Sequence, residues 1–350
     1  MVDVTTIRCQ KGRRGKLSCY GASASESCIQ ALLLPELPPS SPFMANVRVL
    51  HPRVPFDSHR RVGDLVVEVA DRYAAQMNGC EFAGLLRSRR LDRRRYVAFI
   101  SSLYPCVIGF NRALIRSIAK VDHVLHSTFI KNLAQQLHEE QTHNQMWRTK
   151  LDVFGVDHQA LYWDLTDYLS RFSDADLERM TREVLAALTT DPNDYAPGAF
   201  PDAPFPEPVL ALYHQFLMTS TYEDIDYWEH FASQSAIEMT IYSVVSKTVL
   251  PGVQGHPELD GGPATLRWWT EHAKAEGDTA ARTDEEKHLD MSRLALNRSE
   301  TANSLKDAVV ARAEDALRLF AASMACQIVE SERFPLDRYL DTHAVRTGTR

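Results

Sequence analysis

The chain has 350 residues, of which 44% are apolar and 24% charged, a composition that excludes disorder along the whole length and suits one large compact body. The formal net charge of −7 gives the molecule no overall electrostatic attraction to nucleic acid or to an anionic membrane. We therefore expect a small-molecule substrate and neither nucleic acid nor membrane as a partner, and a homodimer remains open. The six cysteines form no Cys-x-x-Cys pair, which favours free thiols in a reducing cytoplasm over disulfides or a zinc finger.

Residues 1–45 differ in composition from the rest of the chain. They mix basic residues with Gly, Ser and three cysteines and end in LPELPPSSP, which cannot continue a helix. The segment is predicted to be a disordered leader, and a start codon assigned upstream of Met44 explains the contrast equally well. We expect one domain over 46–340 and a short tail over 341–350.

The apolar residues after Val62 recur at intervals of three and four, which predicts an all-α protein. Glycines and prolines separate the further helices that this spacing predicts, roughly at 92–120, 122–154, 173–189, 208–250, 263–298 and 302–330. Six prolines in 191–208 predict an extended connection there.

The strongest local signal for chemistry is HEEQTHNQMW at 138–147. Glu140 and His143 are three residues apart on a helical pattern, so both project from one face, whereas Glu139 points about 100° away. A Glu-x-x-His pair supplies a carboxylate and an imidazole for iron or manganese held among helices. The motif also arises by chance on charged helices, so further ligands are needed to support a metal site.

A second candidate is Glu238, which stands among apolar residues in SAIEMTIYSVVSKTVL. A helix of this composition is buried nearly all round, and an unpaired carboxylate there is costly. Glu238 is therefore expected to meet a cation, be protonated or line a cavity; a buried arginine partner or an exposed stripe on the helix are the purely structural alternatives.

The third candidate set lies in WWTEHAKAEGDTAARTDEEKH, which the spacing predicts to be one long helix. His272 and Glu276 are four residues apart on one face of it. A competing set, Asp284, Glu285 and His288, begins three turns later, and His288 would stand about 24 Å from His272 along the axis. We favour His272 and Glu276 because they follow two tryptophans at the apolar start of the helix.

Four runs in this order resemble the heme-oxygenase-like superfamily, and more closely its non-heme diiron oxidase and oxygenase branch. They are FAGLLRSRRLDRRRYVAFISSLYPCVIGFNRALIRSIAKV, FIKNLAQQLHEEQTHNQMWRTKLDVFGVD, SAIEMTIYSVV and WWTEHAKAEGD. The pattern HxxxWxxxLxxFG from His143 to Gly155 is the most specific part. The similarity spans roughly 65–330, with an enlarged middle at 157–207.

This resemblance implies a helical bundle of about seven core helices, three of which hold two ferrous ions. Its implied metal ligands are Glu140, His143, Glu238, His272 and Glu276. Two positions depart from the family pattern: Gln136 stands where many relatives have the first Glu, and Thr279 where they have the last His. Either Glu140 and the 284–288 cluster substitute for these ligands, or the second metal is weakly held or lost.

The resemblance also implies O2-dependent oxidation of a small amine, amino acid or fatty acid, for example by N-oxygenation or oxidative carbon–carbon cleavage. Tyr104, Tyr242 and Trp147 are candidate walls of the pocket. Two alternatives stay open: a metal-free helical-pocket enzyme of the thiaminase-like or quinone-forming type, and a non-catalytic helical binding protein.

Overall fold

The computed structural model describes residues 9–11, 17–19, 60–121, 127–188, 198–221, 225–273 and 284–340. The chain divides into two compact units, Met1–Arg53 and Val54–Arg350. In the first unit, strands β1 (Cys9–Lys11) and β2 (Leu17–Cys19) pair antiparallel, with Cys9 opposite Cys19. The predicted leader over 1–45 otherwise lies outside the described residues and stays a prediction.

The second unit is built from helices, which confirms the predicted all-α bundle. Its helices are α3 (Val62–Gly79), α4 (Glu81–Arg87), α5 (Arg93–Ser102), α6 (Tyr104–Lys120), α7 (Ser127–Val153), α8 (His158–Leu169), α9 (Asp174–Ala187), α10 (Glu207–Thr221), α11 (Tyr227–Val244), the π-helix η2 (Val245–Val249), α12 (Leu250–Val253), α13 (Pro263–Glu271), α14 (Asp284–Arg298), α15 (Glu300–Ser304), α16 (Lys306–Ala325), α17 (Gln327–Arg333) and the 3₁₀ turn η3 (Leu336–Arg338).

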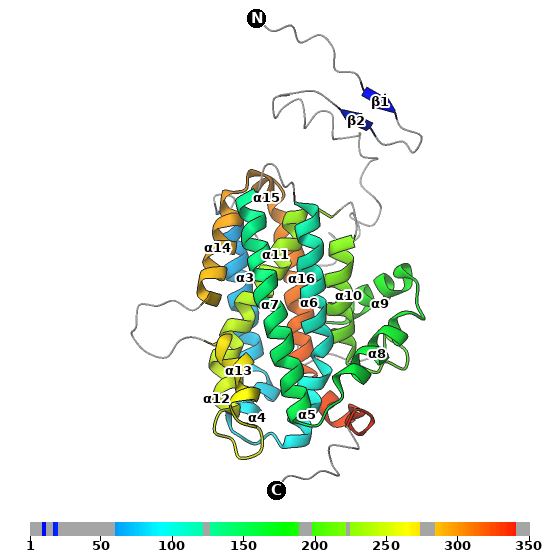
Figure 1. The fold of residues 1–350 in the computed structure, drawn as a ribbon, viewed down its shortest axis with the longest axis vertical. Coiled ribbons are helices and arrows are strands. Elements are labelled where there is room, and N and C mark those ends of the chain that lie inside the picture. Colours follow the sequence, from blue (N-terminus) through cyan, green and yellow to red (C-terminus); the bar gives the residue numbers. More distant parts are fainter. Residues whose placement is uncertain are drawn as a thin grey trace, which may run out of the picture. The chain divides into compact units, whose positions relative to one another are not determined.

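Helix α11 lies at the centre of the bundle, packed against α3 and α16 and also against α6, α10 and α14 (Figure 1). Its side chains are buried on nearly every face, as the apolar sequence around Glu238 predicts. A helix enclosed in this way can present residues to a site inside the bundle.

Helices α7 and α13 bring the remaining site residues to the bundle. Helix α7 packs along α6, and α13 packs on α7 (Figure 1). Helix α7 ends where predicted: Phe154 and Gly155 close it with a turn, and Gly155 has φ of 78°, which glycine adopts without strain. The site is therefore built from helices far apart in the sequence.

The helix predicted over 208–250 is two helices. Helix α10 ends at Thr221, and α11 begins after Asp226, whose side chain accepts a hydrogen bond of 2.8 Å from the backbone N–H of Trp228. An aspartate in this position is a strong helix start. At the other end the helix continues past Val244 through the π-helix η2 and the last turn α12, which begins at Leu250 and ends at Val253.

The helix predicted over 263–298 is also interrupted, so the prediction of one long helix there is wrong. Helix α13 ends at Glu271, and His272 is its C-cap, with φ of −92° and ψ of 5°. His272 Nδ1 lies 2.8 Å from the carbonyl oxygen of Trp268, which also accepts the backbone N–H of His272. Residues 274–283 lie outside the described part, and α14 begins at Asp284.

The enlarged middle contains the short helices α8 and α9, and α9 packs on α10. Ser173 and Asp176 form a capping box at the start of α9. Only 198–206 of the predicted proline-rich connection is described; it leads directly into α10.

One helical stretch, Arg93–Lys120, is long and apolar enough to cross a membrane by length and composition. The sequence analysis expects no membrane partner, and 78% of the apolar window is buried inside the protein. Its apolar side chains therefore pack in the protein interior, as those of a core helix do. The cytoplasmic location stays a prediction.

Candidate metal and substrate site

One face of α7 carries a stripe of polar and aromatic residues turned toward the bundle. Its members, at intervals of four and three, are Gln136, Glu140, His143, Trp147 and Lys150. This spacing keeps residues on one face of a helix. All are buried apart from Glu140, which is partly exposed. Glu140 and His143 therefore lie on the face of α7 that is turned toward the bundle.

Helix α13 places His272 opposite this stripe. The rings of His143 and His272 lie with their centroids 4.3 Å apart. His272 Nδ1 is 2.8 Å from the carbonyl oxygen of Trp268, to which it can only donate, so Nε2 is the nitrogen with a lone pair in the neutral imidazole. Trp268 also stacks on the His272 ring, with centroids 3.8 Å apart and an angle of 18°. Both contacts orient the imidazole.

Three of the predicted ligands converge. Glu140, His143 and His272 each offer one ligand atom within 4.8 Å of the others. His143 Nδ1 lies 3.2 Å from Glu140 Oε1. Two imidazoles and one carboxylate are the donor set of non-heme ferrous sites that keep open coordination positions. The donors therefore fit one iron.

Glu238 lines the same cavity and is 6% exposed. It accepts a hydrogen bond from a residue of α7. Gln136 Nε2 donates a hydrogen bond to its Oε1. Gln136 thus places a neutral amide against the Glu238 carboxylate.

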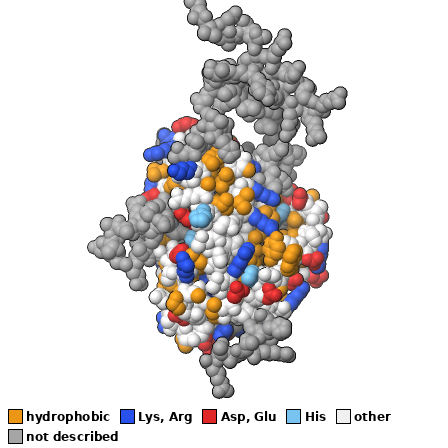
Figure 2. All heavy atoms as spheres, in the orientation of Figure 1, with side chains coloured by type: hydrophobic (Ala, Val, Ile, Leu, Met, Phe, Trp, Pro, Cys, Tyr) orange, Lys and Arg blue, Asp and Glu red, His pale blue; other side chains and the backbone are white. Residues whose placement is uncertain are grey.

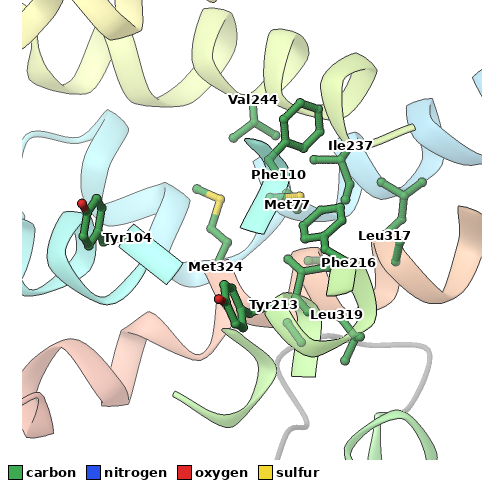
Figure 3. Packing of buried hydrophobic residues seen from close by; sticks show 14 of the residues in the cluster. Met77, Tyr104, Phe110, Tyr213, Phe216, Ile237, Val244, Leu317, Leu319 and Met324 are labelled. Carbon is green, nitrogen blue, oxygen red and sulfur yellow. The ribbon is translucent and has the colours of Figure 1, made fainter. Parts of the chain in front are cut away.

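The site opens into a mainly apolar cavity, in which the centres of water-sized molecules have about 100 Å³ of space. Its walls come from α3, α5, α6, α10, α11 and α16 as well as from α7 and α13. Figure 3 shows six of the wall residues among the buried side chains: Met77, Phe110, Phe216, Ile237, Val244 and Met324. Mainly apolar walls with a few polar groups are typical of a site for a small molecule.

Three tryptophans form the wall beside His272, and a lysine lies behind them. Trp147, Trp268 and Trp269 line the cavity and contact one another edge to face, with centroid distances of 4.8 to 5.2 Å. Lys150 is 0% exposed, and its Nζ lies 3.5 Å from the Trp269 ring centroid and 4.4 Å from that of Trp147. Its Nζ has no hydrogen-bond partner among the described residues. Burial lowers the pKa of the Lys150 ammonium well below its usual range.

The other predicted residues have different outcomes. Glu276 and Thr279 lie outside the described residues, as do the side chains of the 284–288 cluster, so their roles stay predictions. Trp147 lines the cavity as predicted, whereas Tyr104 and Tyr242 are not among its described lining residues. Tyr104 is buried elsewhere and accepts a hydrogen bond of 3.0 Å from Arg148.

Sequence reasoning missed Glu271. Its Oε2 lies 3.6 Å from His143 Nε2, and its other oxygen accepts a hydrogen bond of 2.9 Å from Arg267. The side chain is 39% exposed, so it lies at the rim of the site. Glu271 directly precedes His272 in the sequence, and this was the available signal. On a continuous helix, however, adjacent side chains point about 100° apart, so Glu271 was not expected to share a site with His272.

Surface composition does not mark the site. Figure 2 shows positive, negative and apolar side chains interspersed on the visible face. This mixture of positive and negative side chains agrees with the small net negative charge of the chain.

Comparison with known proteins gives no family assignment. No family model matches the chain, and no curated protein matches it. A solved structure of a TenA homolog from Pseudomonas syringae pv. tomato str. DC3000 is similar at 13% identity and a TM-score of 0.49; the match covers 78% of this chain and 97% of that one. The likeness at this level carries no functional argument.

Proposed function

We propose that this chain is an O2-dependent non-heme iron oxidase or oxygenase acting on a small metabolite of the amine, amino acid or fatty-acid type. One observation carries the proposal: ligand atoms of Glu140, His143 and His272 converge within 4.8 Å of one another beside a mainly apolar cavity. A ferrous ion supplies the one-electron chemistry with O2 that no side chain offers.

The chain's own residues have three tasks in this proposal. The Trp268 carbonyl holds His272 in the tautomer that leaves Nε2 to a metal. The tryptophan wall fixes the ring plane and, with the other apolar walls, excludes water from the reacting face. Glu238 presents a carboxylate to the same cavity.

The number of irons depends on Glu238. We propose one iron at Glu140, His143 and His272, because these donors meet with no contribution from undescribed residues. The pair of irons predicted from the sequence needs Glu238 and further ligands such as Glu276. Iron stoichiometry separates the two arrangements.

A metal-free enzyme is the second candidate, and the contact between Glu140 and His143 favours it. A carboxylate 3.2 Å from an imidazole nitrogen is also a general acid–base pair that needs no metal. In that case the cavity would bind a small heterocycle and the two residues would move its protons.

The test is anaerobic loading with ferrous ion followed by rapid mixing with O2. We expect O2 consumption in proportion to bound iron and an accompanying change in visible absorption. His143→Ala should lose both, and His138→Ala, on the exposed side of the same helix, should keep both. A chain that binds no iron and consumes no O2 would support the metal-free candidate instead.

A further inference from the structure

Glu271 is the last residue of α13 and directly precedes His272. Its Oε2 lies 3.6 Å from Nε2 of His143, which stands on α7. The contact therefore joins the two helices that carry the converging donors. Among the described residues those donors are Glu140, His143 and His272, and Glu271 is not a member of the set. Glu271 lies beside the set and touches one member of it.

The His143 ring lies between two carboxylates. Its Nδ1 is 3.2 Å from Glu140 Oε1, and its Nε2 is 3.6 Å from Glu271 Oε2. A neutral imidazole has one nitrogen with a lone pair, which binds a metal, while the other nitrogen carries the hydrogen and donates it. The two carboxylates therefore have different roles: one stands beside the metal-binding nitrogen, and the other faces the N–H group.

The distances assign these roles. Two adjacent donors of one octahedral ion, each about 2.1 Å from it, lie about 3 Å apart. Glu140 Oε1 and His143 Nδ1 match this separation, and both residues belong to the converging set. Nδ1 is thus the nitrogen of His143 that faces the metal position, and Nε2 is the nitrogen that faces Glu271.

Glu271 is held in place to accept a hydrogen bond. Its second oxygen, Oε1, accepts a bond of 2.9 Å from Arg267, one turn earlier on the same helix. The side chain is 39% exposed, so its charge stays partly hydrated and carries little desolvation cost. A separation of 3.6 Å from His143 is longer than a hydrogen bond, and rotation of this exposed side chain shortens it when the imidazole binds a metal.

We propose that Glu271 is the positioning residue of His143: it accepts the hydrogen of Nε2 and holds the ring with Nδ1 toward the iron. The inference rests on the proposed function and adds an outer partner to its iron site. Both imidazoles are then held through their second nitrogen, His272 by the Trp268 carbonyl and His143 by a carboxylate. A carboxylate in this position also makes the imidazole a stronger donor to the metal.

The experiment measures the binding of cobalt(II) to the full chain after chelator treatment, by its visible absorption. Loss of an outer partner weakens metal affinity about 10- to 100-fold, and we expect this loss in Glu271→Ala. Glu271→Gln should lose less, because its amide oxygen still accepts a hydrogen bond from Nε2. Glu258→Gln, at an exposed position outside the cavity lining, is the matched control and should bind as the wild type does.

Two readouts separate positioning from a structural role and from direct ligation. At saturating cobalt both Glu271 variants should keep the wild-type absorption bands, because the ligands are unchanged, whereas Glu140→Gln should alter the bands and lose more affinity than either. In the iron-loaded protein Glu271→Gln should raise the ferric–ferrous reduction potential, since the lost negative charge favours the ferric ion. Apo circular dichroism checks the fold, and Glu271→Gln carries the test where Glu271→Ala folds poorly.

Wild-type cobalt affinity in both Glu271 variants would overturn the inference and leave the iron site standing. Altered bands in Glu271→Gln would also overturn it, because Glu271 would then be a ligand. A chain that shows the predicted dependence on Glu271 but consumes no O2 when loaded with iron would overturn the proposed function alone. A wild-type chain that binds neither cobalt nor iron would overturn both.

Discussion

Replacing Lys150 by methionine should stabilise the protein. The amine is completely buried, and its Nζ has no hydrogen-bond partner among the described residues. Methionine has a similar length, fills the same space and makes favourable sulfur contacts with aromatic rings. Burying an unsatisfied polar group costs about 1–3 kcal/mol, and the cation–π contacts return about 0.5–2 kcal/mol where the amine is charged. We expect Lys150→Met to raise the free energy of unfolding by about 1–2 kcal/mol at pH 7.

The pH dependence of this gain follows from the direction of the pKa shift. Burial lowers the pKa of Lys150 in the folded state, so the unfolded chain binds the proton more tightly. The wild-type protein therefore gains stability as the pH rises toward the unfolded value of about 10.4, with a slope of at most about 1.4 kcal/mol per pH unit. The difference between variant and wild type should shrink over that range.

Urea unfolding followed by far-UV circular dichroism at pH 7, 8.5 and 10 measures this difference. Lys131→Met is the matched control, because Lys131 is exposed on the same helix. It should change the stability by less than about 0.5 kcal/mol. A loss of more than 1 kcal/mol in Lys150→Met would refute the reasoning and show that the tryptophans hold a favourable ammonium ion.

Three further predictions concern other parts of the bundle. His230→Gln should reduce the loss of stability in acid. Burial lowers the pKa of His230 to about 3, so in the wild-type protein this residue lowers the free energy of unfolding by about 2 kcal/mol as the pH falls from about 6.5 to 5. Urea unfolding at both pH values measures this difference. Gly252→Ala should lower the melting temperature, because an added Cβ would lie 2.6 Å from the Leu86 carbonyl oxygen; an unchanged midpoint in a thermal scan would argue against this close packing. His272→Ala should abolish O2-dependent turnover while His288→Ala leaves it within a few-fold of wild type, and the reverse pattern in an oxygen-electrode assay would move the iron to the 284–288 cluster.

The sequence predicts those features of the site that depend on one helix. Glu140 and His143 share a face because their spacing matches the helical period, and in the structure His143 Nδ1 lies 3.2 Å from Glu140 Oε1. Glu238 was identifiable because a carboxylate in an apolar helix needs a cavity or a partner. The all-α fold follows from the same periodicity along the whole chain.

Features that depend on contacts between helices were not predictable. Gln136 bonds to Glu238 over a sequence separation of 102, which no local pattern encodes. The same holds for Lys150, whose tryptophan neighbours come partly from α13. The end of α13 at Glu271 was also not predicted, because His272 continues the helical spacing in the sequence but is the C-cap in the structure.

The most direct test of the central claim is the iron content and affinity of the purified chain. After anaerobic titration with ferrous ion, Mössbauer spectroscopy and metal analysis should show one high-spin ferrous ion per chain in the wild type. His138→Ala should bind the same amount, whereas His143→Ala should lose the iron and keep its helical circular dichroism, because the ligand contributes little to packing. Iron binding that is absent in the wild type, or unchanged in a folded His143→Ala variant, would contradict the account.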